Sequence, residues 1–211
     1  MPLQFPLATS LALAAALLCG ACAQSAAPRA TAAAPAPSPA SATSAAVTGR
    51  TVVPLKNPSF EPDATGRMAG WSRIEHARGK SYHFVADPEN AYSAPSSARI
   101  TRHGPEFFGA LDQRIKADPA WIGKTARLSG YLKTQGATGV GGALTLQITD
   151  GGGNTLVHNY MDNRRVRGDQ DWKRYSVEVK LPPQTYYINV GPMLEEDGTL
   201  WADDMVLEIL D

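Results

Sequence analysis

The most conspicuous candidate for chemistry in this sequence is an acid within an apolar strand. The closing segment 198–209 alternates with the period of two of a β-strand, and one of its faces carries an aspartate. That face consists of Trp201, Asp203, Met205, Leu207 and Ile209. A carboxylate among apolar side chains costs several kcal/mol when it has no partner. The sequence therefore predicts that Asp203 has a specific partner.

Side chains that could catalyse a reaction are scattered along the chain without a recognised spacing. His76, His83, His103 and His158 form no His-x-x-x-His pair, and no Gly-x-Ser-x-Gly elbow occurs. Glu195-Glu196-Asp197 could supply the paired carboxylates of a glycosidase, but an acidic run before a glycine is typical of a solvated turn. We therefore expect a protein that is not an enzyme, with a small glycan-acting hydrolase as an alternative.

Basic side chains gather at Arg164, Arg165 and Arg167, where they could contact a phosphate or an anionic polysaccharide. Acids at positions 162, 169 and 171 surround this cluster and reduce its field. We interpret the cluster as a charged loop at the rim of a binding surface.

The first forty-eight residues differ in composition from the rest and predict an export signal followed by a linker. They contain one charged residue, Arg29, and are dominated by Ala, Pro and Ser. The apolar stretch 11–18 has the length of the centre of a signal peptide, well short of the roughly 20 residues of a membrane-spanning helix. We predict a signal peptide over 1–23 and a disordered linker over 24–49.

Two processing routes fit the end of this signal peptide. Ala21-Cys22-Ala23 suits an ordinary signal peptidase, whereas 18–22 resembles a bacterial lipoprotein box with Cys22 as the lipidated residue. The linker has the composition of a tether between a lipid anchor and a domain, so we favour lipidation at Cys22. We therefore expect the periplasm or the outer membrane instead of free secretion, with the anchor as the only contact to the membrane.

The remaining chain, 50–211, has the length and charge balance of one exported domain. It contains no cysteine, so its stability must come from its core and not from disulfides. All 20 Asp and Glu and all but one of the 20 Lys and Arg follow residue 48, which leaves this part with a net charge of about −1. A domain without a positive excess is a poor candidate for nucleic-acid binding, and we predict no such partner.

Regular alternation, with turn residues between the segments, predicts that this domain is an antiparallel β-sandwich. Only 118–124 is typical of a short helical turn, and 150–154 predicts a hairpin loop because a β-like segment follows it. The strands are expected at 80–86, 97–102, 108–116, 126–134, 143–149, 155–161, 174–180, 186–191 and 198–209.

The order of motifs along the domain resembles that of the galactose-binding-like jelly rolls. The motifs are Asn57-Pro58-Ser59-Phe60-Glu61 with Gly70-Trp71, the segments 92–100 and 128–133, Asp171-Trp172, and the closing 201–204. In particular, the chain is similar to bacterial carbohydrate-binding modules of cellulases and xylanases, and to modules beside periplasmic peptidases. The resemblance covers 54–210 and implies an all-β jelly roll.

Many such jelly rolls hold a structural calcium ion, and the resemblance implies where its ligands would lie here. The candidates are Glu61, Glu89, Asp203 and Asp204, with Asp87 as an alternative to Glu89. Carboxylates that converge from three distant segments could supply the oxygen ligands that calcium requires. The alternative is that Glu61 and Asp203 accept hydrogen bonds from backbone amides or from the Trp71 indole, without an ion.

The resemblance also implies a sugar-binding face, on which outward side chains of a sheet stack on pyranose rings and bond their hydroxyl groups. The candidates are Tyr131, Lys133, Gln147, His158, Tyr160, Asn163 and Arg164. The alternative is that the two tyrosines only cover a half-buried sheet. Among the tryptophans, we expect those at 71, 172 and 201 in the core or at its margin and Trp121 at the surface.

These features predict a non-catalytic, carbohydrate-binding-like module of the bacterial cell envelope, whose partner is a glycan or polysaccharide. The alternative is a periplasmic protein-interaction module, in which the same face recruits an enzyme or a peptide. Apart from the calcium ion, no cofactor is expected.

Overall fold

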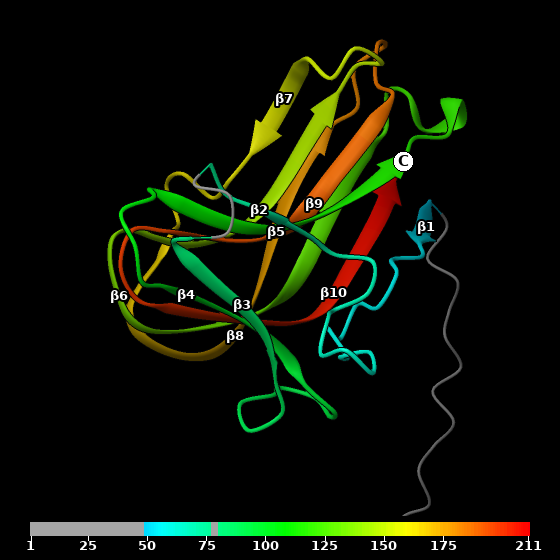
Figure 1. Ribbon diagram of the computed structural model, residues 1–211. Coiled ribbons are helices and arrows are strands. Elements are labelled where there is room, and N and C mark those ends of the chain that lie inside the picture. Colours follow the sequence, from blue (N-terminus) through cyan, green and yellow to red (C-terminus); the bar gives the residue numbers. More distant parts are fainter. Residues whose placement is uncertain (1–48, 77–79) are drawn as a thin grey trace, which may run out of the picture. The chain divides into compact units, whose positions relative to one another are not determined.

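In the computed structural model, which describes residues 49–76 and 80–211, ten β-strands and one 3-10 turn follow one another (Figure 1). The predicted signal peptide (1–23), almost all of the predicted linker (24–49) and Cys22 lie outside the described residues. Within these ranges, no helix has the length and apolar character needed to cross a membrane. The elements are β1 (Arg50–Val53), β2 (Ser72–Ile74), β3 (Tyr82–Asp87), β4 (Ser97–Arg102), β5 (Phe108–Lys116), η1 (Pro119–Trp121), β6 (Thr125–Thr149), β7 (Thr155–Asn159), β8 (Val166–Lys180), β9 (Tyr187–Glu195) and β10 (Thr199–Leu210).

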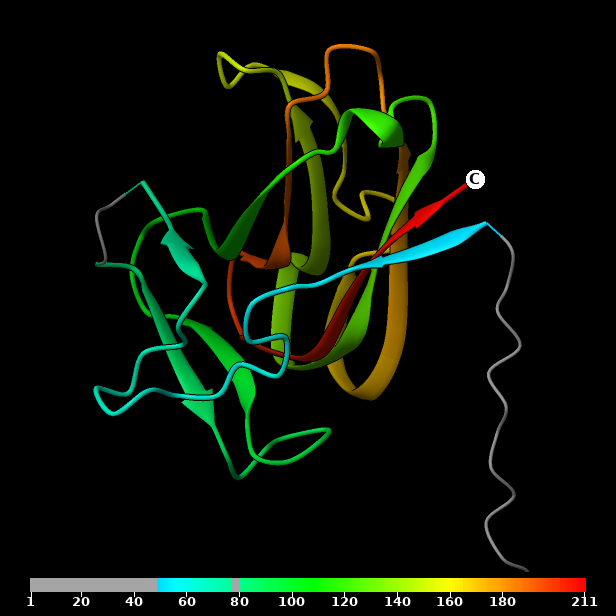
Figure 2. The ribbon, with the colours of Figure 1, turned by 90° about the vertical axis from the view of Figure 1, so that its right-hand side faces the viewer.

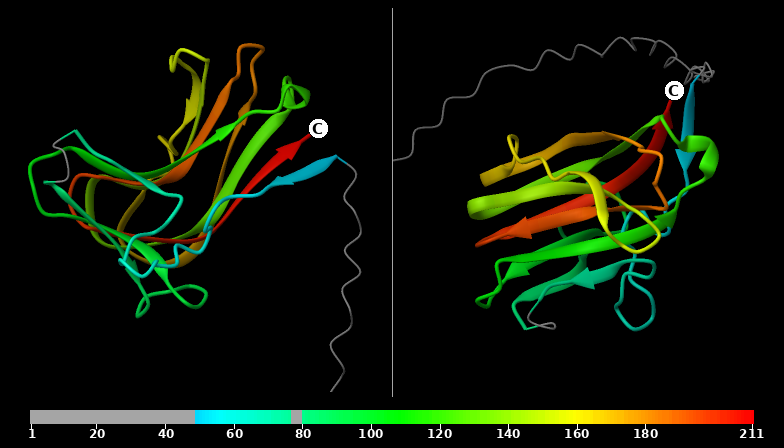
Figure 3. Two further views of the ribbon diagram at one scale, coloured as in Figure 1. Left: turned by 45° about the vertical axis from the view of Figure 1, so that its right-hand side comes forward. Right: turned by 90° about the horizontal axis from the view of Figure 1, so that it is seen from above.

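The strands form two layers, which confirms the predicted antiparallel β-sandwich (Figures 2 and 3). One layer has the order β3–β4–β10–β6–β8, with β1 paired to the end of β10. The other has the order β2–β5–β9–β6–β7. Strand β6 belongs to both layers, because its first half pairs with β8 and β10 while its second half pairs with β7 and β9.

The long strand β6 differs from the sequence prediction of two separate strands at 126–134 and 143–149. Gly136, Gly139 and Gly141 lie between these halves with φ of 59°, 61° and 90°, a region that glycine adopts without strain. The register with β8 also shifts here, as expected where a strand bends. The glycines therefore redirect the strand from one layer into the other, where the sequence suggested a break.

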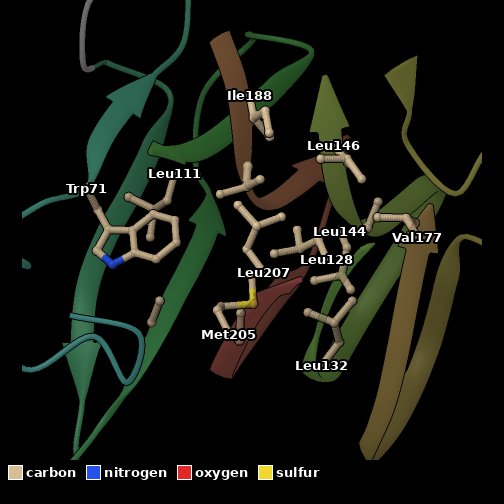
Figure 4. Packing of buried hydrophobic residues seen from close by; sticks show 14 of the residues in the cluster. Trp71, Leu111, Leu128, Leu132, Leu144, Leu146, Val177, Ile188, Met205 and Leu207 are labelled. Carbon is tan, nitrogen blue, oxygen red and sulfur yellow. The ribbon is translucent and has the colours of Figure 1, made fainter. Parts of the chain in front are cut away.

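Apolar side chains of both layers meet in one core between them (Figure 4). Leu128 and Leu132 from the first half of β6, and Leu144 and Leu146 from its second half, are fully buried. Each such side chain contributes about 1.5–3 kcal/mol when it leaves water. Trp71 lies at one end of this core, as predicted. Trp121, expected at the surface, is half-buried there and packs against one edge of the core.

The closing strand β10 changes its inward side at a β-bulge. Leu200 and Ala202 lie in the core before the bulge, and Met205 and Leu207 lie in the core after it. The register with β6 shifts between residues 203 and 206, and Asp204 has φ of 50° there. The prediction that Trp201 and Asp203 share one core face with Met205, Leu207 and Ile209 is therefore wrong. Trp201 and Asp203 belong to the outer side of this layer, where both are buried and Asp203 contacts the loop between β3 and β4.

Candidate functional site

The partner of Asp203 is the backbone of the loop between β3 and β4. Its Oδ2 accepts hydrogen bonds from the amides of Tyr92 at 3.0 Å and Ser93 at 2.9 Å, and its Oδ1 accepts one from the amide of Asp204 at 2.8 Å. The residue is fully buried, and this burial raises the pKa of its carboxyl group although the amide hydrogen bonds oppose the shift. Asp203 therefore fastens the loop to β10.

Asp204 connects the same loop to the opening motif of the domain. Its Oδ1 accepts hydrogen bonds from the hydroxyls of Ser93 at 2.7 Å and Ser59 at 3.4 Å. The amide of Met205 also donates to the carbonyl of Pro58 at 3.2 Å. The two ends of the domain's sequence thus meet in space and close the fold.

The four predicted calcium ligands do not gather around one point that would suit an ion. In residues 49–76 and 80–211, no group of three or more His, Cys, Asp or Glu side chains could hold a metal. Both oxygens of Asp203 face N–H donors, and the side chains of Glu61 and Glu89 are exposed. These residues do not fit a calcium site as they lie, so the ion stays a prediction based on the resemblance alone. Titration of the metal-stripped protein with calcium, followed by its melting temperature, tests that prediction.

The seven predicted sugar-binding residues lie on two different faces. Tyr131 and Lys133 belong to the first half of β6, and their side chains point outward beside those of Tyr92 and Trp201. Gln147 and His158 pair across β6 and β7 in the other layer, and the ring centroids of His158 and Tyr160 are 4.5 Å apart. The structure therefore divides these candidates between two separate surfaces.

The last two of the seven candidates, with their neighbour Arg165, belong to the loop between β7 and β8. Asn163 and Arg164 are exposed, and a guanidinium N–H of Arg164 donates to the carbonyl of Ser176 at 2.8 Å. The side chain of Arg165 is only 4 % exposed and donates to Glu195 at 3.0 Å. The basic cluster, interpreted as a charged loop at the rim of a binding surface, thus divides into the exposed Arg164 and the buried, ion-paired side chain of Arg165.

A groove of about 420 Å³ crosses the outer face of the β5–β9–β6 sheet, and we call it the β5–β9 groove. Its apolar part consists of Ile74, Phe108, Ala110, Leu111, Tyr160 and Met193. Its polar part consists of Asp112, Arg114, Thr145, Gln147, Asn189 and Glu195. Apolar surface combined with a few convergent polar groups is the usual composition of a small-molecule or sugar site.

Hydrogen bonds between neighbouring strands fix most of the polar groups of the β5–β9 groove. Arg114 donates from Nε to Oδ1 of Asn189 at 2.9 Å, which links β5 to β9. Gln147 donates from Nε2 to the hydroxyl of Thr155 at 2.6 Å. At one end of the groove, Glu195 is held by the buried Arg165. A ligand would therefore meet side chains that are already oriented.

Asp112 is the exception, because within the described residues no donor forms a hydrogen bond to its carboxylate. Burial raises the pKa of this carboxyl to about 6, and the positive charge of Arg114 opposes that increase. Burial also raises the pKa of Tyr160, and the charge of Asp112 adds to it. A half-buried carboxylate without a protein donor can accept hydrogen bonds from the hydroxyl groups of a ligand.

Sequence reasoning found Gln147 and Tyr160 but missed the β5 side of the groove. The alternation of 108–116 was recognised as a strand, and its outward positions are Phe108, Ala110, Asp112 and Arg114. Asp112 and Arg114, an acidic and a basic residue two positions apart on the outward side of this strand, were the sequence pattern that could have indicated this side of the groove.

No family model matches the chain. Among curated proteins, it is similar to an uncharacterized HTH-type transcriptional regulator, YbfP of Bacillus subtilis (strain 168), with 26% identity over 148 residues. The match covers 69% of this chain and 49% of that protein, so the chain spans about half the length of this relative. The described residues contain one helical element, the turn η1, and hence no helix-turn-helix.

Several solved structures share the fold at low sequence identity. The CBM22-1 xylan-binding domain from Paenibacillus barcinonensis Xyn10C has a TM-score of 0.56 and 15% identity, over 77% of this chain and 97% of that domain. The CBM22-1-CBM22-2 tandem of the same protein has a TM-score of 0.55 and 17% identity, over 79% of this chain and 47% of the tandem. The enzymatically active domain of tailspike protein 4 from bacteriophage CBA120 has a TM-score of 0.54 and 10% identity. The match covers 74% of this chain and 22% of that chain. The expected resemblance to carbohydrate-binding jelly rolls is therefore confirmed at the level of the fold.

Proposed function

We propose that this protein is a non-catalytic module of the bacterial cell envelope that binds a glycan in the β5–β9 groove. The observation that carries the proposal is the groove itself, in which an apolar floor lies beside fixed polar groups from β5, β6 and β9. The fold supports it, because the chain superposes on nearly the whole of a xylan-binding domain. A fold by itself does not determine a ligand, so the proposal depends on the groove.

Each part of the β5–β9 groove has a role in this binding. The rings of Phe108 and Tyr160 offer apolar faces to a pyranose, whose C–H groups leave water when they contact these rings. Asp112 accepts hydrogen bonds from sugar hydroxyls, and the amide of Gln147 can donate and accept them. Glu195 is already paired with Arg165, so it orients the ligand at one end and does not act as an acid catalyst.

Replacement of Tyr160 by alanine is expected to weaken glycan binding about tenfold, because the ligand loses a stacking surface of the groove. Affinity electrophoresis in gels that contain soluble arabinoxylan, β-1,4-galactan or mixed-linkage β-glucan measures the effect as reduced retardation. Tyr186→Ala is the matched control, since Tyr186 is exposed and lies outside the groove. Equal retardation of both variants would contradict the proposed role of Tyr160. A protein partner that binds the native chain, with no retardation by any polysaccharide, would favour the protein-interaction alternative.

The envelope location rests on the amino-terminal segment and has its own test. In a bacterial host, metabolic labelling with palmitate is expected to mark the full chain but not its Cys22→Ser variant. Labelling of both, or of neither, would contradict lipidation at Cys22.

A further inference from the structure

A second surface with the chemistry of a sugar site lies on the outer face of the other layer. We call it the β8–β6–β10 face, and its members are Tyr92, Tyr131, Lys133, Gln170, Trp172 and Trp201. The rings of Tyr92 and Tyr131 are stacked, with centroids 3.5 Å apart and planes at 14°. Trp172 meets Tyr92 edge-on at 6.0 Å. Tyr92 is 45% exposed, so the aromatic cluster remains open to solvent at its outer side.

A hollow of about 520 Å³ adjoins this aromatic cluster. Amide and charged side chains from different segments line it, among them Asn90, Gln135, Gln170 and Asp171. Lys133 extends over the ring of Trp201, with Nζ 5.5 Å from the ring centroid, and reaches to 3.4 Å from Oδ1 of Asn90. Hydrogen-bonding groups thus stand directly beside ring faces, as sugar recognition requires.

Buried hydrogen bonds hold the floor of this hollow in place. The indole N–H of Trp201 donates to Oδ2 of Asp87 at 2.8 Å, and Asp87 also accepts a hydrogen bond from Arg99 at 3.2 Å. Desolvation acts to raise the pKa of Asp87, but the hydrogen bonds from Trp201, Asn90 and the amide of Glu89, with the charge of Arg99, hold this pKa below its usual value. The carboxylate therefore stays charged and keeps the indole fixed. Trp201 is only 5% exposed and lies under Lys133, so it forms a rigid floor for the hollow, and the exposed aromatic surface of this face comes from Tyr92 and its neighbours.

The charges on this face favour a neutral glycan over an anionic one. Asp169 and Asp171 line the hollow opposite the single ammonium of Lys133. The hollow thus carries no positive excess that would attract a polyanion. Asp169 and Asp171 also accept hydrogen bonds from the amides of Gly136 at 2.6 Å and Trp172 at 2.8 Å, which fixes their positions.

The two surfaces lie on opposite sides of the core. The β5–β9 groove is on the outer face of the layer that contains β5 and β9, and the β8–β6–β10 face is on the outer face of the layer that contains β8 and β10. We propose that the β8–β6–β10 face is a second binding site for a neutral glycan, and that the protein thereby connects two glycan chains. The connecting activity rests on the proposed function of the groove, whereas the second site itself does not.

Light scattering and affinity electrophoresis with the same full-length protein test the second site and the groove separately. The native chain is expected to be retarded by at least one of arabinoxylan, β-1,4-galactan and mixed-linkage β-glucan, and to raise the turbidity of that polysaccharide in solution. Trp172→Ala is expected to abolish the turbidity and to leave retardation by the groove. Gln170→Ala, which removes only an amide at the surface, is expected to lower the turbidity without any effect on folding.

The pattern of outcomes distinguishes failure of the second site from failure of the groove. Turbidity that persists in both Trp172→Ala and Gln170→Ala, or a titration that gives one glycan site per native chain and none in Tyr160→Ala, would overturn the second site. Retardation that survives Tyr160→Ala but is lost in Trp172→Ala would leave the second site standing and remove the groove. No retardation by any of the three polysaccharides would overturn both.

Discussion

Replacement of Asp203 by alanine is expected to lower the free energy of unfolding by about 3 kcal/mol or more. The change leaves the amides of Tyr92, Ser93 and Asp204 without their acceptor, and each buried donor without a partner costs about 1–3 kcal/mol. For a domain of this size, 3 kcal/mol corresponds to a fall in melting temperature of roughly 6–12 °C. Thermal and urea unfolding of the purified protein measure the loss.

Two further variants define what Asp203 contributes. Asp203→Asn keeps the volume and one acceptor oxygen, so its loss of stability is expected to lie between that of the native chain and that of Asp203→Ala. Asp171→Ala is the surface control, because Asp171 is exposed and accepts a single hydrogen bond from the amide of Trp172. If Asp203→Ala were no less stable than Asp171→Ala, Asp203 would not anchor the loop.

Asp203 also shows which features of this fold the sequence pattern predicts and which it does not. The need for a partner followed from one carboxylate among apolar residues, and the structure supplies that partner. The sequence pattern did not predict which residues of β10 face the core along its whole length. A β-bulge at 203–206 shifts the inward-facing residues from even to odd positions. A bulge depends on contacts with β6 and with the loop 92–93, which lie far away in the sequence.

Strands with regular alternation and flanking turns were predictable, whereas bends between layers were not. The observed bounds of β4 and β5 equal the predicted 97–102 and 108–116. Strand β6 was predicted as two strands from their alternation, and the glycines between them, Gly136, Gly139 and Gly141, are equally compatible with a turn and with a bent strand. Only pairing with β8 and β9 determines which of the two occurs.

The candidate site was predictable in part, for a similar reason. Tyr131 and Tyr160 were recognised as outward aromatics, but period two within separate strands cannot tell which layer a strand joins. The structure places these tyrosines on opposite faces, and it adds Asp112 and Asn189 from β5 and β9 to the groove. The environment of Asp112 arises from this strand pairing and so is absent from any local pattern.

Asp112→Asn is expected to stabilise the protein at neutral pH and to change its stability by much less at pH 4. The folded-state pKa of about 6 lies above the ordinary value of 3.8, so the folded protein binds this proton more tightly than the unfolded chain does. Well below pH 3.8 the carboxyl is protonated in both states and has no effect, and at pH 4 only a small part of the effect is present. Between about pH 3.8 and pH 6 the unfolded chain loses this proton while the folded protein keeps it, so the cost grows across this range and reaches about 3 kcal/mol at most above pH 6, where both states are ionised.

Two measurements on Asp112→Asn distinguish a carboxylate that binds a ligand from one that is only buried. They are the pH dependence of the gain in stability and the loss of glycan binding. Urea unfolding at pH 4 and pH 7.5 measures the gain, and Asp197→Asn, at an exposed surface ion pair, is expected to change stability by less than about 1 kcal/mol at either pH. A gain of equal size at both pH values, or none, would contradict an unpaired Asp112 in the folded protein. Because a charged acceptor binds hydroxyl groups more strongly than a neutral amide, Asp112→Asn is also expected to weaken glycan binding about tenfold at pH 7.5. Residues of a binding site often lower the stability of the protein while they strengthen its binding of a ligand. The two measurements together test whether Asp112 is such a residue.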